Sequence, residues 1–492
     1  MIFDFFGRKN LKKKVATPKS AAPIYLTNTL TGEKEEFTPP PIGPVKMYNC
    51  GPTVYDTQHI GNLSAFVSAS LLRNTLEYNG LEVKQVINIT DVGHLTSDAD
   101  EGEDKMRGAL KREGKKPTLE NMNELAQKYT AVFREDLEKL HIDTSKIEFP
   151  QASKYVDAQI AFIQALHDKG YTYEIKDGVY FDTSLFEGYG ALGNIDIEKQ
   201  KKGARTVVNK EKKHPSDFAL WKFSRTIGWD SPWGKGFPGW HIECSAMIRS
   251  TLGEQIDIHT GGIEHIGVHH NNEIAQSEAA TGKKPLSRFW LHRAHIQLEG
   301  EKMAKSEGRV VYLSDIIEKG YSPLAFRYWL LQGHYRTPMN FTWEALDASQ
   351  KALWRLWKLR ATLPKETSEA PDETWQKQFR EKINNDIDTA GALAVLWDMT
   401  KDNTLEPEVF LATLLDFDRV FMIGIENPDK AVVEQALSAT EVPEKIQKLL
   451  VEREEAREKK EWARADDIRK DIEKQGFEVK DTEKGPELRK AK

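Results

Sequence analysis

The spacing of hydrophobic and polar positions near the start of the chain predicts a parallel β-sheet. The segment PVKMYNC (44–50) reads as a strand, and GNLSAFVSASLLRNTLEYNG (61–80) has its apolar residues at helical spacing. Gly80 suits the end of that helix, and LEVKQVINIT (81–90) then reads as a buried strand. A strand, a helix and a strand in this order form a βαβ unit, which requires parallel strands.

This α/β pattern is interrupted and then resumes. Residues from about 120 to 225 predict helices and one mixed segment, VYFDTSLFEGYGALG (179–193). Two further strands are predicted, EQIDIHTGG (254–262) and HRAHIQLEG (292–300), with a helix starting at residue 269 between them. We therefore expect an α/β nucleotide-binding fold that is split by an inserted domain.

The chain beyond about residue 330 is predicted to be mostly helical. It includes LDASQKALWRLWKLRATL (346–363), a polar acidic linker (363–373) and a further helical block to about residue 440. The end of the chain reads as two charged helices and a short strand, which together form a small appended module.

Composition narrows the class of protein. Of the 492 residues, 39% are hydrophobic and 30% charged, which is typical of a globular protein, and the formal net charge of −6 argues against coating nucleic acid by bulk electrostatics. Basic segments at 7–14 and 199–214 could still bind RNA locally. The most apolar window, 410–425, contains charged residues and is too short to span a bilayer, so we expect a cytosolic protein without a membrane partner.

Two thiols and a helical His–Glu pair suggest a metal site. Cys50 and Cys244 are the only cysteines, and His269 and Glu273 are four positions apart on a predicted helix, so they share a face. The four side chains have the composition of a zinc site, with His270 as a competing ligand. Four such ligands form either a closed structural metal site or, beside a phosphate-binding turn, a metal site that contacts a substrate.

Two further segments are suited to nucleotide phosphates. His59 and Asn62 fall where the first strand passes into the helix, whose N-terminus offers free N–H groups and a positive dipole end. The segment EKMAKSEG (301–308) places Lys302 and Lys305 three positions apart, and two ammonium groups there would stabilise negative charge on the phosphates.

Together these segments resemble a known family. HIGN (59–62) with KMAKS (302–306) is similar to the paired signatures of class I aminoacyl-tRNA synthetases. A longer set of segments resembles the cysteine-specific members of this class in particular. These segments cover about residues 25–345, and a weaker similarity is found near the end of the chain. Those segments are NTLTGEKEEF, MYNCGPTVYD, NITDV, DFALWKFS, SPWGKGFPGWHIECSAM, DIHTGG, HHNNEIAQS, HYRTPMNFT, EWARADDIR and DTEKG.

The resemblance implies a Rossmann-like catalytic domain with a parallel sheet, a helical anticodon-binding region and a small C-terminal module. The implied division is a flexible basic tail (1–22), the first catalytic half (23–120), an inserted connective or acceptor-end domain (121–225), the second catalytic half (226–330), a helical tRNA-binding domain (331–440) and a C-terminal anticodon-binding module (441–492).

The resemblance also implies roles for individual residues. Cys50, Cys244, His269 and Glu273 would hold one Zn²⁺ that binds the thiolate of the substrate cysteine. The remaining implied contacts are Gly51, Thr53, Thr90 and Trp240 with the amino acid, and His59, Asn62, Gly262, Glu264 and Lys305 with ATP. His59, Asn62, Lys302 and Lys305 would be the catalytic residues.

The implied activity is that of a cysteine–tRNA ligase. A monomer would activate L-cysteine with ATP and Mg²⁺ to cysteinyl-adenylate, and transfer the cysteinyl group to the 3′ end of tRNA(Cys). Three alternatives are a related ligase that joins cysteine to a small amine, a class I synthetase for another amino acid, and a non-catalytic tRNA-binding relative. The thiol-rich metal set argues against the second, and intact His59, Asn62, Lys302 and Lys305 argue against the third.

The chain departs from the usual family pattern at several places, among them the longer segment NITDVGHLTSDADEGEDK (88–105). Ala304 stands where the lysine signature often has Ser, which removes a hydroxyl but leaves both lysines. Glu264 replaces an expected Asp near the ribose, and KGPELRK (484–490) lacks the tryptophan that usually follows the DT..G motif.

Overall fold

The computed structural model describes residues 22–91, 105–195, 209–298, 300–302, 310–428, 444–459, 461–482 and 485–490. The predicted basic tail, apart from residue 22, lies outside this part of the chain. Among the helices of these described ranges, none is long and apolar enough to cross a membrane.

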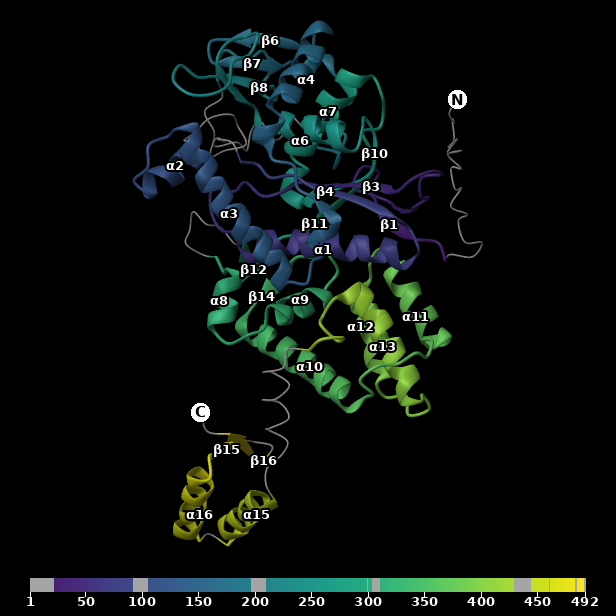
Figure 1. The fold of residues 1–492 in the computed structure, drawn as a ribbon, viewed down its shortest axis with the longest axis vertical. Helices are drawn as coiled ribbons and strands as arrows, with labels where there is room; N and C mark the ends of the chain where they lie inside the picture. Colours follow the sequence, from purple (N-terminus) through teal and green to yellow (C-terminus); the bar gives the residue numbers. More distant parts are fainter. Residues whose placement is uncertain are drawn as a thin grey trace, which may run out of the picture.

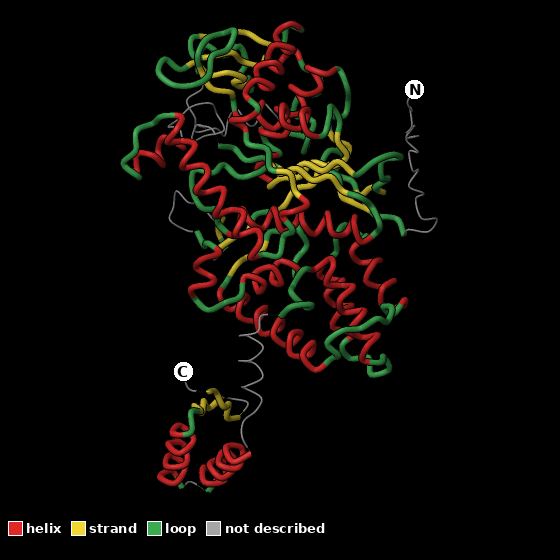
Figure 2. The backbone as a smooth tube through the Cα atoms, viewed as in Figure 1, coloured by secondary structure: helices red, strands yellow, loops and turns green. Residues whose placement is uncertain are grey.

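A five-stranded parallel sheet lies at the centre of the main body, between a mixed region of helices and strands and a mainly helical region (Figure 1, Figure 2). Its spatial order is β11-β10-β3-β4-β5, and every pairing is parallel. The strands are β3 (Val45–Asn49), β4 (Val83–Ile87), β5 (Ile147–Glu148), β10 (Ile256–Gly262) and β11 (Ser287–Arg293). This confirms the Rossmann-like fold class. Because the strand order reverses between β3 and β10, their carboxyl ends open a crevice of the kind in which such sheets bind ligands.

Helix α1 (Ile60–Tyr78) joins β3 to β4, as the hydrophobic pattern predicts. Leu63 and Val67 are fully buried and Phe66 nearly so, because the sheet covers one side of the helix and α13 (Pro407–Phe421) packs on another. Gly80 follows the helix end with a φ of +79°, a left-handed conformation that favours glycine.

Helices α6 (Trp240–Thr251) and α7 (His269–Thr281) lie on the opposite side of the sheet from α1 (Figure 1). Helix α7 is the crossover between β10 and β11, so its first turn begins just beyond the carboxyl end of β10. The predicted helix at residue 269 is therefore confirmed, and the fold carries its N-terminal residues to the crevice.

The region between the two halves of the sheet contains an antiparallel sheet that the sequence analysis described only as a mixed segment. Its order is β6-β7-β8-β9. The strands are β6 (Thr172–Ile175), β7 (Gly178–Phe181), β8 (Phe218–Phe223) and β9 (Gly236–Pro238), accompanied by α4 (Val156–Asp168). The strands are three to six residues long, too short for their alternation to stand out in the sequence.

The prediction of one strand over 292–300 was wrong. Strand β11, at one edge of the five-stranded sheet, begins earlier and ends at Arg293, and the chain then enters a separate three-stranded sheet. That sheet consists of β12 (Ile296–Leu298), β13 (Glu301–Lys302) and β14 (Met339–Phe341). The break after Arg293 leaves this residue at the edge of the crevice.

The remaining elements are mostly helices, and α10 (Trp343–Thr362) with the irregular segment after it confirms the predicted helix and linker. The others are β1 (Tyr25–Thr27), β2 (Lys34–Glu36), α2 (Lys105–Arg112), α3 (Leu119–Lys139), α8 (Leu313–Glu318), α9 (Pro323–Leu331), α11 (Glu373–Ile383) and α12 (Thr389–Met399).

The C-terminal module has a small core of its own, formed by Ile446, Ile468, Ile472, Phe477 and Val479. It contains two helices as predicted, but a β-hairpin where the sequence analysis expected one short strand. These elements are α15 (Glu444–Glu458), α16 (Trp462–Lys474), β15 (Phe477–Thr482) and β16 (Gly485–Lys490).

Candidate active site

A cavity of about 420 Å³ opens at the carboxyl ends of β3 and β10. Its walls bring together candidate residues from segments that are up to about 200 positions apart in the sequence. The candidates in its walls are Cys50, Gly51, Thr53, His59, Asn62, Trp240, Gly262 and Glu264. Thr90 is not a wall residue, but it pairs with Thr53 in a parallel β-bridge and so lies directly behind the wall.

One end of the cavity is formed by the N-terminus of α1. His59 is the N-cap residue, and its Nδ1 accepts a hydrogen bond of 3.2 Å from the backbone N–H of Asn62. The Ile60 N–H already donates to the backbone oxygen of Val311 at 2.9 Å, so the first turn would bind an anion such as phosphate through the Gly61 N–H and the positive end of the helix dipole. Of the two candidate lysines, Lys305 and the side chain of Lys302 lie outside the described residues.

A tight turn after β3 forms the wall between this end and the thiols. The N–H of Gly51 donates to Asn88 Oδ1 at 2.7 Å, and a Cβ at residue 51 would lie 1.5 Å from the backbone oxygen of Asn88. Only glycine fits this approach. Asn88 also donates to Thr90 Oγ1 at 3.2 Å, and Thr90 donates to Glu243 Oε2 at 3.1 Å, so the wall is held by a chain of hydrogen bonds.

The third part of the wall comes from the ends of β10 and β11. The N–H of Gly262 donates to His265 Nδ1 at 3.2 Å, and Glu264 Oε2 lies 3.5 Å from His295 Nδ1. The sequence analysis missed several wall residues here and nearby, namely Tyr55, Gln58, Arg293, His295 and Ile296. Arg293 and His295 were placed inside one long strand, which hid the fact that the chain turns at the cavity.

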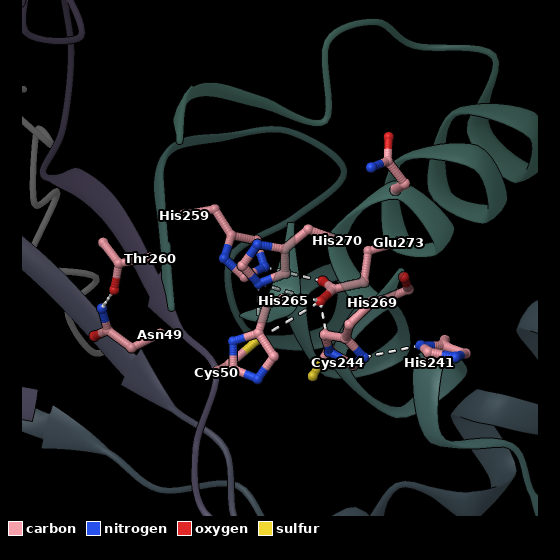
Figure 3. A network of polar contacts seen from close by, with 12 residues as sticks. Asn49, Cys50, His241, Cys244, His259, Thr260, His265, His269, His270 and Glu273 are labelled. Atoms are coloured by element: carbon pink, nitrogen blue, oxygen red, sulfur yellow. Dashed lines mark hydrogen bonds and ion pairs between the residues drawn. The ribbon is translucent and has the colours of Figure 1, made fainter. Parts of the chain in front are cut away.

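A buried cluster of thiols, imidazoles and a carboxylate adjoins the cavity (Figure 3). Cys50, Cys244, His269 and Glu273 each present a ligand atom within 4.8 Å of the others. Glu273 Oε1 lies 2.8 Å from His269 Nε2 and 3.6 Å from Cys50 Sγ. The structure thus brings the four predicted ligands together, from the end of β3, from α6 and from α7.

Further histidines surround this cluster and were missed by the sequence analysis. His259 Nε2 lies 2.9 Å from Glu273 Oε2, and His241 Nδ1 lies 2.9 Å from His269 Nδ1. A second group that could hold a metal ion is Cys50, His259, His270 and Glu273, in which His270 Nε2 is 3.1 Å from Cys50 Sγ. The competing ligand His270 is therefore also in place, and its Nδ1 lies 2.8 Å from Nε2 of His292.

Burial and mutual contact shift the protonation of these groups. The hydrogen bond with Cys50 lowers the pKa of Cys244 to about 7, whereas burial and the contact with Cys244 raise the pKa of Cys50. Burial alone would raise the pKa of the Glu273 carboxyl, but His259 and His269 hold it well below its usual range. These shifts favour the anionic forms of Cys244 and Glu273, which are the forms that bind a metal ion.

The donor set fits a zinc ion. Thiolates, imidazole and carboxylate are the ligands that Zn²⁺ takes in proteins, and it usually binds four of them tetrahedrally. The group with both thiols supplies softer and more negative donors than the group with one thiol and two histidines. The chemistry of the site therefore favours Cys50, Cys244, His269 and Glu273 as the ligands.

Comparison with known proteins identifies the family of the chain. Residues 37–351 match the family described as tRNA synthetases class I (C) catalytic domain, and residues 439–489 match the cysteinyl-tRNA ligase anticodon binding domain. In structure, the chain is similar to methionyl-tRNA synthetase of Mycobacterium tuberculosis in complex with methionyl-adenylate, with a TM-score of 0.50, 14% identity and coverage of 78% of this chain and 90% of that one. At this identity the likeness shows the fold alone.

Relatives of nearly full length are more similar in sequence. Cysteine–tRNA ligase 1 of Burkholderia lata is 45% identical, with 95% of this chain and 97% of that protein covered. Cysteine–tRNA ligase of Thermus thermophilus is 40% identical, with 95% and 99% covered.

The family match and the relatives of nearly full length define a class I aminoacyl-tRNA synthetase, which is a ligase. Within that class, the chain belongs to the family of the cysteine–tRNA ligases.

Proposed function

We propose that the chain activates L-cysteine with ATP and transfers the cysteinyl group to the 3′ end of tRNA(Cys). One observation carries this proposal. The same cavity has the Cys50 end of the thiol cluster in one wall and the N-terminus of α1, with His59 and Asn62, in another. A thiol-binding site and a phosphate-binding site thus lie within reach of one small substrate.

One zinc ion per chain is part of the proposal. Cys50, Cys244, His269 and Glu273 would hold it, with His259 and His241 orienting the carboxylate and the imidazole. When bound, zinc favours a deprotonated sulfur over a hydroxyl. This preference would discriminate cysteine from serine more strongly than shape alone, which is worth about 1–3 kcal/mol of binding free energy. The ligands reach the cavity through Cys50, which supports a substrate-contacting site over a closed structural one.

The first step joins cysteine to AMP. A carboxylate oxygen of cysteine attacks the α-phosphorus of ATP, and the bond from that phosphorus to the leaving diphosphate breaks. His59, Asn62 and the Gly61 N–H at the start of α1 would bind the phosphates, which carry Mg²⁺, and Gly262 and Glu264 would border the nucleoside. Lys302 and Lys305 remain proposed from the sequence as further phosphate contacts.

The amino-acid end of the cavity orients the attacking carboxylate. Gly51, Thr53 and Trp240 line it, and Thr90 supports Thr53 from behind. The Trp240 ring lies 4.5 Å, centroid to centroid, from that of His269, which places an apolar face next to a proposed metal ligand.

The second step transfers the cysteinyl group. A hydroxyl of the terminal adenosine of tRNA attacks the carbonyl carbon of the adenylate, and AMP leaves with the electrons of the broken bond. The match of residues 439–489 to an anticodon-binding family supports tRNA as the acceptor, since a ligase that uses a small amine has no need of such a module. A non-catalytic relative would also bind tRNA. Only the formation of cysteinyl-tRNA therefore distinguishes this proposal from that alternative.

A monomer in the cytoplasm is the proposed state. The two cysteines are free thiols, which suits a reducing compartment. The molar mass of the metal-loaded chain, measured by sedimentation equilibrium, tests whether it is a monomer.

The function is tested by ATP–diphosphate exchange with each of the twenty amino acids, with and without tRNA. We expect strong exchange with cysteine alone and no requirement for tRNA. Equal exchange with serine, or none with cysteine, would overturn the proposal.

A further inference from the structure

Arg293 occupies a distinctive position at the carboxyl end of β11. It lies opposite Gly262 in the register of the sheet, and it lines the active-site cavity. Its relative exposure is only 5%, so a guanidinium group is buried in the floor of the site. The proposal developed here rests on the proposed function, because it assumes that nucleotide binds in this cavity.

The contacts of this guanidinium do not neutralise its charge. NH1 donates to the backbone oxygen of His334 at a long 3.5 Å, NH2 approaches Met339 Sδ at 3.2 Å, and Nε has no hydrogen-bond partner. Within the described part of the chain, Arg293 forms no ion pair with a carboxylate, and Glu264 in the same cavity faces His295 instead. Burial without such a partner lowers the pKa of Arg293 to about 10.

The space behind Arg293 offers no anion either. A small cavity of about 20 Å³ shares Arg293 and Ala65 with the active-site cavity and continues under α1. Its other lining residues are Ser68, Ala69, Leu72, Thr260, Gly261, Leu291, Tyr335 and Ile387, which are apolar or neutral. Arg293 thus lines both spaces, and among the described residues that line the smaller one none is an anion, so the active-site side is where a negative charge can be supplied.

A buried charge without a counter-ion is strongly unfavourable, and arginine is the side chain best suited to bind phosphate. We propose that Arg293 is a nucleotide-binding residue whose guanidinium interacts with the α-phosphate of the bound nucleotide. The α-phosphate is the anionic group that ATP, the adenylate and AMP have in common. In the free protein Arg293 lowers stability, and bound nucleotide supplies the missing negative charge.

The test compares ligands that differ only in phosphate. Binding of AMP and of adenosine to the full-length, metal-loaded protein is measured by calorimetry for wild type, Arg293→Met and Arg293→Lys. We expect Arg293→Met to weaken AMP binding about 10-fold or more, the scale for losing a hydrogen bond to a charged group, and to change adenosine binding less than about twofold. Arg293→Lys keeps the charge and should lie between.

Thermal unfolding without ligand separates this role from a structural one. Removing an unpaired buried charge should leave the melting temperature of Arg293→Met at or above that of wild type, whereas loss of a structural contact would lower it. Arg288→Met is the matched control. Arg288 lies on the same strand and pairs with Asp257 at 3.1 Å outside the cavity, so its loss should leave both affinities unchanged.

Two results would overturn the assignment of Arg293. One is an equal loss of AMP and adenosine affinity in Arg293→Met, and the other is unchanged AMP affinity in that variant while wild type binds AMP normally. Failure of wild type to bind AMP at all would instead overturn the proposed function, and this inference with it.

Discussion

The Sγ of Cys50 lies 3.6 Å from Oε1 of Glu273, although 223 positions separate the two residues. Cys50 follows the last residue of β3, and Glu273 is in the second turn of α7, the crossover from β10 to β11. Their contact spans the point at which the strand order of the sheet reverses. The proposed metal site is therefore built where the fold itself opens a crevice, and metal binding should be coupled to the stability of the catalytic domain.

Glu273→Gln tests the metal ligands. The amide keeps the shape but loses the negative charge, so we expect zinc retention to fall by at least about 10-fold, the lower bound for disturbing even a supporting residue of a metal site. Zinc per chain after dialysis against a chelator is the measurement. Glu278→Gln is the control, since Glu278 is on the same helix but outside the cluster. Equal retention in both variants would contradict the ligand assignment.

His59 caps α1, and its proposed role in phosphate binding can be separated from that capping role. As N-cap it accepts from Asn62, and asparagine is an equally good N-cap, so His59→Asn should preserve the melting temperature. The rate of cysteine-dependent ATP–diphosphate exchange by His59→Asn should nevertheless fall by about 10²–10³-fold. This is the scale for losing one preorganised hydrogen-bond donor at a developing charge. His59→Ala should show the same loss of exchange and also a loss of about 1 kcal/mol in stability. A fully active His59→Asn would leave only the capping role.

Gly51→Ala should disturb the turn between the thiol and phosphate ends. The added Cβ would lie 1.5 Å from the backbone oxygen of Asn88, so the turn must shift, at a cost of about 1–3 kcal/mol in the free energy of unfolding. The Michaelis constant for cysteine should rise. Gly108→Ala, in α2 with open space around it, is the control and should be neutral or stabilising. Unchanged cysteine affinity in Gly51→Ala would show that this approach does not shape the site.

Asp418 predicts a pH dependence in the helical region. Burial raises its pKa to about 6, although the N–H groups of Ile423 and Ile425 and the charge of Arg327 oppose the shift. The folded state thus keeps this proton to higher pH than the unfolded state, whose pKa is about 3.9. The stabilisation from Asp418 is present below about pH 4 and is lost as pH rises to about 6, by about 2–3 kcal/mol in total.

Asp418→Asn removes the titratable proton, so the pH dependence of the difference between variant and wild type isolates this effect. The melting temperature of the variant minus that of wild type should increase as the pH rises from 4.5 to 7, measured by differential scanning fluorimetry. Asp398→Asn removes an exposed carboxylate and should give a flat difference. A difference that falls with pH for Asp418→Asn would contradict the sign of the shift.

Elements with long, regular hydrophobic patterns could be predicted from the sequence. Contacts between side chains that lie far apart in the sequence could not. Helix α1 has apolar residues on nearly every turn, and His269 and Glu273 share a face through helical spacing alone, so both were predicted. His259 and His292 were missed because each stands alone in its strand and meets the cluster only through the order of the sheet. Arg293 was missed for a related reason, since its role depends on where β11 ends.

The most direct test of the central claim is the absorption spectrum of the protein with Co²⁺ in place of zinc. If the metal at Cys50, Cys244, His269 and Glu273 contacts the substrate thiolate, L-cysteine should strengthen the sulfur-to-cobalt charge-transfer band, because a coordinating thiol is deprotonated and adds a sulfur ligand. L-serine at the same concentration should leave the band unchanged. A spectrum that is already complete and does not respond to cysteine would contradict the account.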